Sequence, residues 1–175
     1  TGSYSAGCAI HRSLAGRPNV LLALEMGGNN PLVIHRAQDL DAAAYLAVIS
    51  AFVTAGQRCT CARRLILPDS DYVDPLLERI TKLCRSLHVG TSHDDPQPFM
   101  GPVISRQAAD RVLAAQASLM QNGGLALAQS QPVSGNHALI RPGIIDVTAV
   151  VDRDDEEVFG PLLQVIRVPS FEAAL

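Results

Sequence analysis

The spacing of apolar positions alternates along this chain between the intervals typical of helices and the short runs typical of strands. The clearest helical pattern begins at Ser70 or Asp71, where apolar side chains recur every three or four residues. They are Val73, Leu76, Leu77, Ile80, Leu83, Cys84 and Leu87. Glu78 and Lys82 form an i,i+4 pair on the opposite, polar side. The pattern therefore predicts an amphipathic helix.

Other stretches extend this alternation over the whole chain. We predict further helices over 6–14, 39–54 and 106–121, and short strands over 20–24, 31–34, 64–67, 139–141 and 162–168, with another near Ala126. The stretch 39–54, which Asp39 caps, is apolar on nearly every face and predicts a fully buried helix. A last helix is expected to begin at Phe171. Strands that alternate with helices predict an α/β fold with a largely parallel sheet.

The composition of the chain excludes several classes of protein. Of its 175 residues, 47% are hydrophobic and 18% are charged, so the chain can bury a sizeable core and is not a disordered tail. The net charge of −3 provides no basic surface for nucleic acid. The longest apolar stretch, 42–53, is too short to cross a membrane, and we identify no signal peptide. We expect a protein that binds neither nucleic acid nor membranes.

The four cysteines indicate a reducing environment. Cys8, Cys59, Cys61 and Cys84 show no spacing typical of a zinc site, and a chain so rich in apolar residues needs no disulfides. We therefore predict no metal and a cytoplasmic protein. Cys8 and Cys84 fit helix faces as small buried hydrophobic residues.

A carboxylate stands at the end of an apolar run in segment 24–31. Glu25 follows that run, and Gly27 and Gly28 come directly afterwards, where they let the backbone turn sharply and approach another group. A carboxylate that enters an apolar pocket has a raised pKa, which suits a general base near neutral pH. The alternative is a residue that caps or forms a salt bridge at an ordinary strand end.

A potential nucleophile follows the helix predicted over 39–54. Cys59 comes directly after Arg58, in a turn that begins at Gly56. A thiol attacks only as its thiolate, and Arg58 together with nearby backbone N–H groups favours that form. A buried structural cysteine is the alternative interpretation, and on chemistry alone Cys61 competes as the nucleophile.

An acidic run over 154–157 leads into a strand-like stretch. Four acids in a row usually form a solvated face, and we interpret 154–156 in this way. Glu157 and Phe159 lie two residues apart, and so on one side of an extended stretch that Gly160 and Pro161 end. Such a pair can bind a sugar hydroxyl and pack against a flat ring.

These segments, in this order, resemble motifs of the aldehyde dehydrogenase superfamily. Residues 25–31 are similar to its general-base motif E-L-G-G-K-x-P, and residues 56–59 to its nucleophile motif G-Q-x-C. Residues 157–161 are similar to its motif E-x-F-G-P. Residues 1–3 and 101–104 also resemble family segments, so the resemblance covers nearly the whole chain.

The resemblance implies oxidation of a small aldehyde in two stages. Cys59 would attack the carbonyl carbon to form a thiohemiacetal, and hydride transfer to NAD⁺ would leave a thioester on its sulfur. Glu25 would then activate the water that hydrolyses the thioester. The residues implied in cofactor binding are Gly2, Ser3, Glu157 and Phe159, with Glu157 on the nicotinamide ribose. NAD⁺ is the expected cofactor, and NADP⁺ is the alternative.

The resemblance also implies a division into domains. Residues 1–17 would be the end of a Rossmann-type NAD-binding domain, and residues 18–175 a three-layer catalytic domain that is incomplete at its C-terminus. No G-x-G-x-x-G run occurs, and family members are more than about twice this long. We therefore expect a fragment that is inactive alone and belongs to a homo-oligomer when complete.

The amino-acid sequences of segments 23–31, 50–64 and 142–145 suggest the substrate. They are most similar to the branch of the family that oxidises N-succinylglutamate semialdehyde in bacterial arginine breakdown. An anionic substrate needs cationic partners, and Arg58 and Arg63 are candidates by position. The alternatives are another semialdehyde dehydrogenase or a CoA-acylating dehydrogenase of the same superfamily, or an inactive structural or interaction module.

Overall fold

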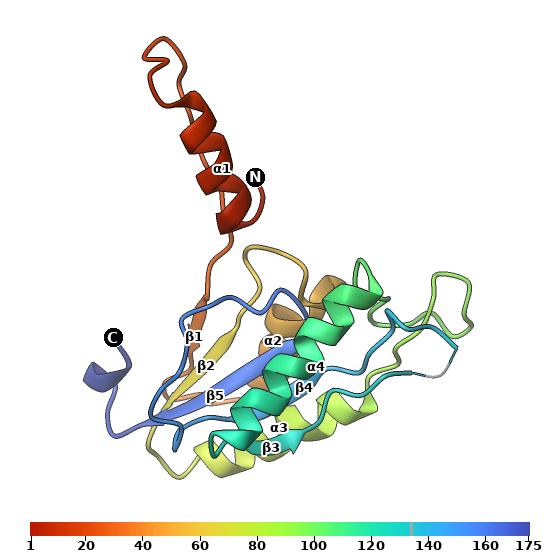
Figure 1. The fold of residues 1–175 in the computed structure, drawn as a ribbon. Helices are drawn as coiled ribbons and strands as arrows, with labels where there is room; N and C mark the ends of the chain where they lie inside the picture. The colour runs from red at the N-terminus through yellow and green to blue at the C-terminus, as the bar shows by residue number, and fades with distance from the viewer. Residues whose placement is uncertain (134) are drawn as a thin grey trace.

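A computed structural model describes residues 1–133 and 135–175 of the chain. Within them, five strands form one sheet in the order β1-β2-β5-β4-β3 (Figure 1). The strands are β1 (Pro31–Val33), β2 (Arg64–Pro68), β3 (Leu125–Ala128), β4 (Gly143–Asp146) and β5 (Leu162–Val168). The first four strands in this order pair in parallel, and β3 pairs antiparallel with β4. The predicted α/β fold with a largely parallel sheet is confirmed.

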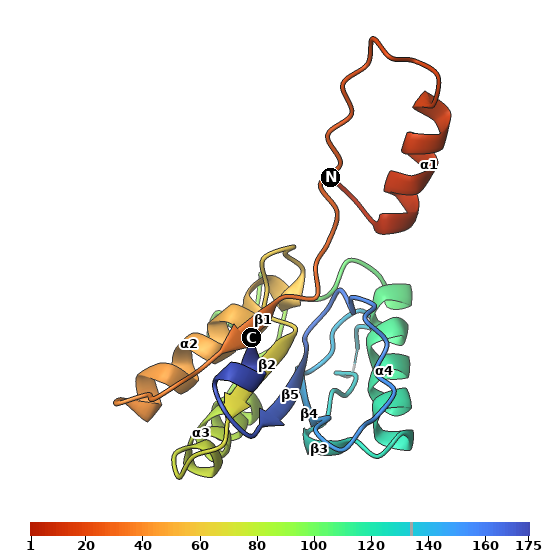
Figure 2. The same ribbon diagram turned by 90° about the vertical axis from the view of Figure 1, so that its left-hand side faces the viewer.

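Helices cover both faces of the sheet. They are α2 (Leu40–Phe52), α3 (Val73–Ser86) and α4 (Arg106–Gln121). Figure 2 shows α2 and α3 on one side of the sheet and α4 on the other, so that the body has three layers. α2 packs against α3, and α4 contacts β4.

Local sequence explains where two of these helices begin. Asp39 accepts hydrogen bonds from the N–H groups of Asp41 and Ala42 before α2, and Ser105 accepts one from Ala108 before α4. The bounds of α4 agree with the predicted range at both ends, whereas α3 begins slightly later than predicted.

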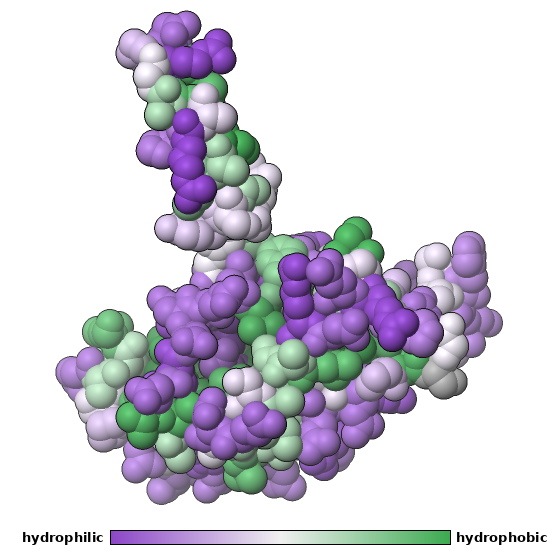
Figure 3. Space-filling view, viewed as in Figure 1, coloured by the Kyte–Doolittle hydropathy of each residue, from purple (hydrophilic) through white to green (hydrophobic). Residues whose placement is uncertain are grey.

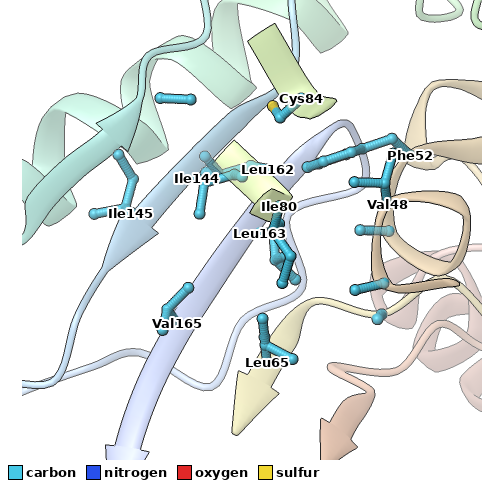
Figure 4. Packing of buried hydrophobic residues seen from close by; sticks show 14 of the residues in the cluster. Val48, Phe52, Leu65, Ile80, Cys84, Ile144, Ile145, Leu162, Leu163 and Val165 are labelled. Carbon is cyan, nitrogen blue, oxygen red and sulfur yellow. The ribbon is translucent and has the colours of Figure 1, made fainter. Parts of the chain in front are cut away.

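The core lies on both faces of the sheet, against the helix pair α2 and α3 on one face and against α4 on the other. The cluster in Figure 4 includes Val48 and Phe52 from α2, Ile80 from α3, Leu65 from β2 and Leu163 from β5. Each is at most 2% exposed, and burial of a side chain of this size contributes about 1.5–3 kcal/mol. This packing fixes β2 and β5, and with them the loops that precede these strands.

The segment 1–26 forms an arm that projects from this body (Figure 1). It contains α1 (Tyr4–Leu14) and an extended segment that runs back toward the body. The two ends of the arm are joined by a hydrogen bond of 3.0 Å from the Gly2 N–H to the Glu25 carbonyl oxygen. Figure 3 shows hydrophilic and hydrophobic residues side by side along the arm. The prediction of a buried strand over 20–24 is wrong, because this run pairs with no described strand and Leu21 is 95% exposed.

Three further predictions differ from the structure. The helix predicted over 39–54 is not fully buried, because Tyr45 and Leu46 are exposed, and it gives way at Val53–Gly56 to the 3₁₀ turn η1. The strand predicted over 139–141 forms only an isolated bridge at Ile140, and the paired strand is β4, which follows it. The helix expected at Phe171 is a 3₁₀ turn, η2 (Glu172–Ala174).

Candidate functional site

Three loops that carry motif residues meet at one edge of the sheet. Residues 25–30 lead into β1, residues 57–63 into β2, and residues 157–161 into β5. These strands are neighbours and run parallel, so the loops before them lie at the same edge. The sheet topology therefore brings together motifs that are far apart in the sequence.

The backbone that follows α2 turns through an uncommon conformation. Thr54 and Ala55 both have φ of 55°, and Gly56 has φ of 66°, so three consecutive residues are left-handed. This conformation costs about 1–2 kcal/mol for each residue that carries a Cβ. At Gly56 a Cβ would also overlap the carbonyl group of Gly160. The turn before the nucleophile motif therefore packs directly on the loop before β5.

The side chain of Gln57 ties this turn to a second loop. Its Oε1 accepts a hydrogen bond from the Ile104 N–H at 2.7 Å. Its Nε2 donates to the carbonyl oxygens of Thr54 at 3.2 Å and Pro102 at 3.5 Å. Gln57 thus joins the G-Q-x-C motif to segment 101–104, which also resembles the family.

Asn30 holds the nucleophile loop from the neighbouring loop. Its Nδ2 donates to the carbonyl oxygens of Cys59 at 2.5 Å and Cys61 at 3.1 Å. Its own carbonyl oxygen accepts from the N–H groups of Arg63 at 2.9 Å and Arg64 at 3.2 Å. One residue of the general-base motif therefore fixes the backbone from the candidate nucleophile to the start of β2.

The cysteines differ in access to solvent. Cys59 is exposed, whereas Cys61 is 2% exposed and its thiol lies 3.8 Å from the Val53 carbonyl oxygen. Cys8 is half-buried, and Cys84 is buried, where desolvation raises the pKa of its thiol to about 12. Accessibility and motif position coincide at Cys59, which favours it over Cys61 as the nucleophile.

The arm carries the other predicted catalytic residue, Glu25. Its carboxylate is exposed and bonds to no other side chain in the part of the chain that the structure describes. The structure shows no contact between this carboxylate and Cys59, so its role as a base stays a prediction. Ser3 accepts a hydrogen bond from the Ala6 N–H and caps α1, and the roles of Gly2 and Ser3 toward a cofactor also stay predictions.

Glu157 is bound by the loop that precedes β2. Its Oε1 accepts hydrogen bonds from Nε and Nη2 of Arg63, at 3.1 and 2.9 Å. A Cβ at Gly27 would overlap the other carboxylate oxygen, so that glycine permits the close approach. Phe159 is 46% exposed, and its ring centroid lies 5.3 Å from the Arg63 guanidinium carbon. All three motif segments therefore meet around this ion pair.

Arg58 and Arg63, the cationic candidates for an anionic substrate, have different positions. Arg58 is exposed, while Arg63 is buried and paired with Glu157. Arg63 is therefore occupied within the site and is not a free cation for a substrate carboxylate.

The acidic run contributes a contact that a purely solvated face would lack. Asp155 accepts a hydrogen bond from Asn29 Nδ2 at 3.2 Å and pairs with Arg64. These hydrogen bonds lower the pKa of the Asp155 carboxyl below its ordinary value. The interpretation of 154–156 as a solvated face is confirmed, since all three residues are exposed, and Asp155 in addition links the general-base motif to β2.

Sequence reasoning missed the structural roles of Gln57, Asn30 and Arg63. Gln57 and Asn30 stand inside the motifs, so the motif wording was the available signal. For Arg63 the signal was a charge at the start of an apolar strand, which fits a buried ion pair as well as a substrate contact. The partner could be identified only from the sheet order.

The rest of the described surface offers no competing metal centre. Residues 1–133 and 135–175 contain no group of three or more His, Cys, Asp or Glu side chains that could hold a metal ion. In the same ranges no helix has the length and apolar character needed to cross a bilayer. Two surface hollows lie elsewhere, one beside Arg85 and Arg141 and one beside α4, and neither includes a predicted site residue.

Comparison with known proteins gives close sequence relatives. N-succinylglutamate 5-semialdehyde dehydrogenase of Pseudomonas fluorescens (strain Pf0-1) is 53% identical over 176 residues, which cover 100% of this chain and 36% of that protein. The protein of the same name from Ectopseudomonas mendocina (strain ymp) gives the same identity and coverage. The chain thus spans about a third of the length of the curated relatives it matches.

Solved structures show the same fold. A 1-pyrroline-5-carboxylate dehydrogenase of Thermus thermophilus is 31% identical with a TM-score of 0.83, covering 99% of this chain and 34% of that one. A structure from Sinorhizobium meliloti 1021 complexed with NAD is 24% identical with a TM-score of 0.87, covering 99% and 36%. The family model described as "Aldehyde dehydrogenase family" matches residues 1–175. The chain belongs to the aldehyde dehydrogenase family.

Proposed function

We propose that the complete protein with this sequence is an NAD⁺-dependent aldehyde dehydrogenase that oxidises N-succinylglutamate semialdehyde to N-succinylglutamate. Family membership supports the reaction class, and 53% identity to relatives of that name supports the substrate. Because the chain covers 36% of those relatives, the activity is proposed for the complete protein. We place this step in arginine breakdown on the same grounds.

The observation that carries the proposal is the convergence of three loops at one sheet edge. Asn30 binds the backbone at Cys59, and Arg63 binds Glu157 beside Gly27. Each motif therefore contacts the other two through atoms at hydrogen-bond or van der Waals distance. Such an arrangement can hold a nucleophile, a water-activating group and a cofactor contact together, as a two-stage oxidation requires.

Cys59 is the proposed nucleophile that attacks the aldehyde. Its side chain is exposed, and its backbone N–H makes no hydrogen bond within residues 1–133 and 135–175. That N–H is free to donate to the oxyanion that forms when the sulfur adds to the carbonyl carbon. The thiohemiacetal formed by this addition is then oxidised to a thioester on the Cys59 sulfur.

Glu25 is the proposed base for the second stage. Its carboxylate is exposed on the arm, two residues before the glycine that contacts Glu157. From there it would take a proton from the water that attacks the thioester. A CoA-acylating enzyme would instead pass the acyl group to CoA and would need no base at this position.

Glu157 and Phe159 form the part of the site that fits a nicotinamide ribose. The side chain of Glu157 is 17% exposed, so a carboxylate oxygen can accept from ribose hydroxyls. The exposed ring of Phe159 can pack against the nicotinamide. When bound, NAD⁺ would act as the oxidant by accepting hydride from the substrate carbon. Gly2 and Ser3 are proposed as further cofactor contacts.

Two features of the complete protein belong to the same proposal. Residues 1–17 would end a cofactor-binding domain, and residues 18–175 would belong to the catalytic domain. We also expect a homo-oligomer, which sedimentation of the complete protein would detect. A monomer at working concentrations would contradict this expectation.

The test is NADH formation by the complete protein with N-succinylglutamate semialdehyde and a panel of other semialdehydes. We expect the highest kcat/KM with the succinylated substrate, and free N-succinylglutamate as the product. Cys59→Ser should abolish NADH formation, whereas Cys8→Ser, on α1, should retain it. Activity in Cys59→Ser would overturn the nucleophile assignment. A product released only in the presence of CoA would favour the acylating alternative.

A further inference from the structure

Arg63 is nearly fully buried although it carries a charge. It is 1% exposed and is the largest of the fully buried side chains in the described chain. A charge in a protein interior is tolerated only where it is paired and hydrogen-bonded. The position of Arg63 therefore requires a reason beyond core packing.

The guanidinium of Arg63 connects two loops of the site. Nε and Nη2 donate to the same oxygen of Glu157, and Nη2 also donates to the Arg58 carbonyl oxygen at 3.1 Å. Arg58 directly precedes Cys59. The Arg63 guanidinium therefore contacts both the Glu157 carboxylate, which is proposed to bind the cofactor, and the backbone next to the proposed nucleophile. The ring of Phe159 covers the same guanidinium.

The hydrogen bonding of this ion pair is incomplete within the described residues. Nη1 of Arg63 is buried and has no partner there. The second carboxylate oxygen of Glu157 faces Gly27 and accepts no hydrogen bond in the same residues. Buried donors are rarely left unpaired, so Nη1 leaves this guanidinium able to bind a further polar group.

We propose that Arg63 is a positioning residue that holds the Glu157 carboxylate and the backbone beside Cys59 at a fixed separation. The inference rests on the proposed function and adds a coupling to it. Releasing Glu157 from Arg63 also frees the guanidinium that holds the Arg58 carbonyl. Cofactor affinity and the reactivity of Cys59 therefore change together when Arg63 is replaced.

Lysine would not replace Arg63 fully. Arginine presents its donors in a rigid planar fork, whereas lysine carries one compact ammonium. In Arg63→Lys the charge beside Glu157 remains, but the simultaneous bond to the Arg58 carbonyl is lost. This variant should therefore keep more of the affinity for cofactor than of the native reactivity of Cys59.

The chain offers a matched control in Arg167. Its Nε donates to Asp146 at 3.0 Å and its Nη1 to Asp74 at 2.7 Å. Arg167 thus also bridges two acidic residues from different elements, but at the other end of β5 from the site. Arg167→Met removes a comparable bridge without touching the three loops.

The experiment compares the complete protein with its Arg63→Met, Arg63→Lys and Arg167→Met variants. Calorimetric titration gives the Kd for NAD⁺, and mass spectrometry of iodoacetamide-treated protein gives the alkylation rate of Cys59. We expect Arg63→Met to raise Kd about tenfold or more and to change the alkylation rate at least about fivefold. Arg63→Lys should change Kd less, and Arg167→Met should leave both within about twofold. If Arg63→Met leaves either quantity within about twofold, the inference is wrong.

A second variant covers the case in which Arg63→Met does not fold. Glu157→Gln keeps the size of the side chain but removes the charge that pairs with Arg63. It should change the alkylation rate of Cys59 even without cofactor, and an unchanged rate would overturn the inference. A wild-type protein that binds no NAD⁺ and labels Cys59 no faster than Cys8 would contradict the proposed function as well. Normal wild-type behaviour with unaffected variants would contradict this inference alone.

Discussion

Replacement of Asn30 by alanine tests how the nucleophile loop is held. The substitution removes the amide that donates to the carbonyl oxygens of Cys59 and Cys61. The backbone bonds from Arg63 and Arg64 to the Asn30 carbonyl remain, so β1 and β2 stay paired. We therefore expect the sheet to persist while the loop loses its fixed position.

The size of the effect follows from the two bonds that are lost. A hydrogen bond contributes about 0.5–1.5 kcal/mol net, so the free energy of unfolding should fall by about 1–3 kcal/mol. The lower half of this range is expected, because Cys59 is exposed and water can replace the amide at its carbonyl oxygen. Asn30→Asp should cost more than Asn30→Ala, because an ionised carboxylate cannot donate and would face two carbonyl oxygens.

Urea unfolding of the complete protein and its variants measures these losses. Asn29→Ala is the matched control, since Asn29 donates a single hydrogen bond to the exposed Asp155 and its loss should cost under about 1 kcal/mol. The alkylation rate of Cys59 should change in Asn30→Ala and not in Asn29→Ala. Equal destabilisation by the two alanine variants, or an Asn30→Asp variant more stable than Asn30→Ala, would refute the reasoning.

Three further predictions test other parts of the structure. Gly56→Ala adds a Cβ that overlaps the loop before β5, whereas a Cβ at Gly123, also at positive φ, meets nothing within 4 Å. Thermal unfolding should therefore show a larger loss of stability for Gly56→Ala than for Gly123→Ala. Equal losses of stability would count against the packing of Gly56 on the loop before β5. Burial raises the pKa of the Cys84 thiol to about 12, so at pH 9 Cys84 should react with iodoacetamide roughly a hundredfold or more slower than an unshifted thiol, as peptide mapping would show. Hydrogen bonds lower the pKa of Asp155 below its ordinary 3.8, so it stabilises the fold above that pH and ceases to do so as pH falls through the lowered value. Asp155→Asn should therefore flatten the fall in stability below about pH 4, and an unchanged acid profile would contradict the contact.

Much of the fold follows from local patterns in the sequence. The bounds of α4 agree with prediction because Ser105 caps its start and Asn122, Gly123 and Gly124 stop it, and these signals are local. β5 agrees over residues 162–168, since a short run rich in apolar and β-branched residues after Gly-Pro predicts a strand.

The strand errors arise where a partner decides the structure. Residues 20–24 have the composition of a strand, but no described strand lies beside them, and they stay extended on the arm. β4 begins at a glycine and is short, so its own pattern is weak. It is a strand because it fits between β5 and β3.

For the site, motif order located the loops but not the contacts between them. Cys59 and Glu157 could be named as candidate site residues from their motifs. That Asn30 would bind the Cys59 loop and Arg63 would bind Glu157 depends on β1, β2 and β5 being neighbours in that order. From the sequence alone, several polar side chains in these loops were equally good candidates for these contacts, because the order of the strands was not known.

In the complete protein, we propose Cys59 as the nucleophile of an aldehyde dehydrogenase and Glu25 as the base that releases the acid product. The most direct measurement mixes the Glu25→Gln variant of the complete protein with NAD⁺ and N-succinylglutamate semialdehyde, then quenches the reaction for peptide mapping. We predict a burst of about one equivalent of NADH and a succinylglutamyl thioester on the peptide that contains Cys59. An acyl group on Cys61, or steady turnover at the wild-type rate without an adduct, would contradict these roles of Cys59 and Glu25.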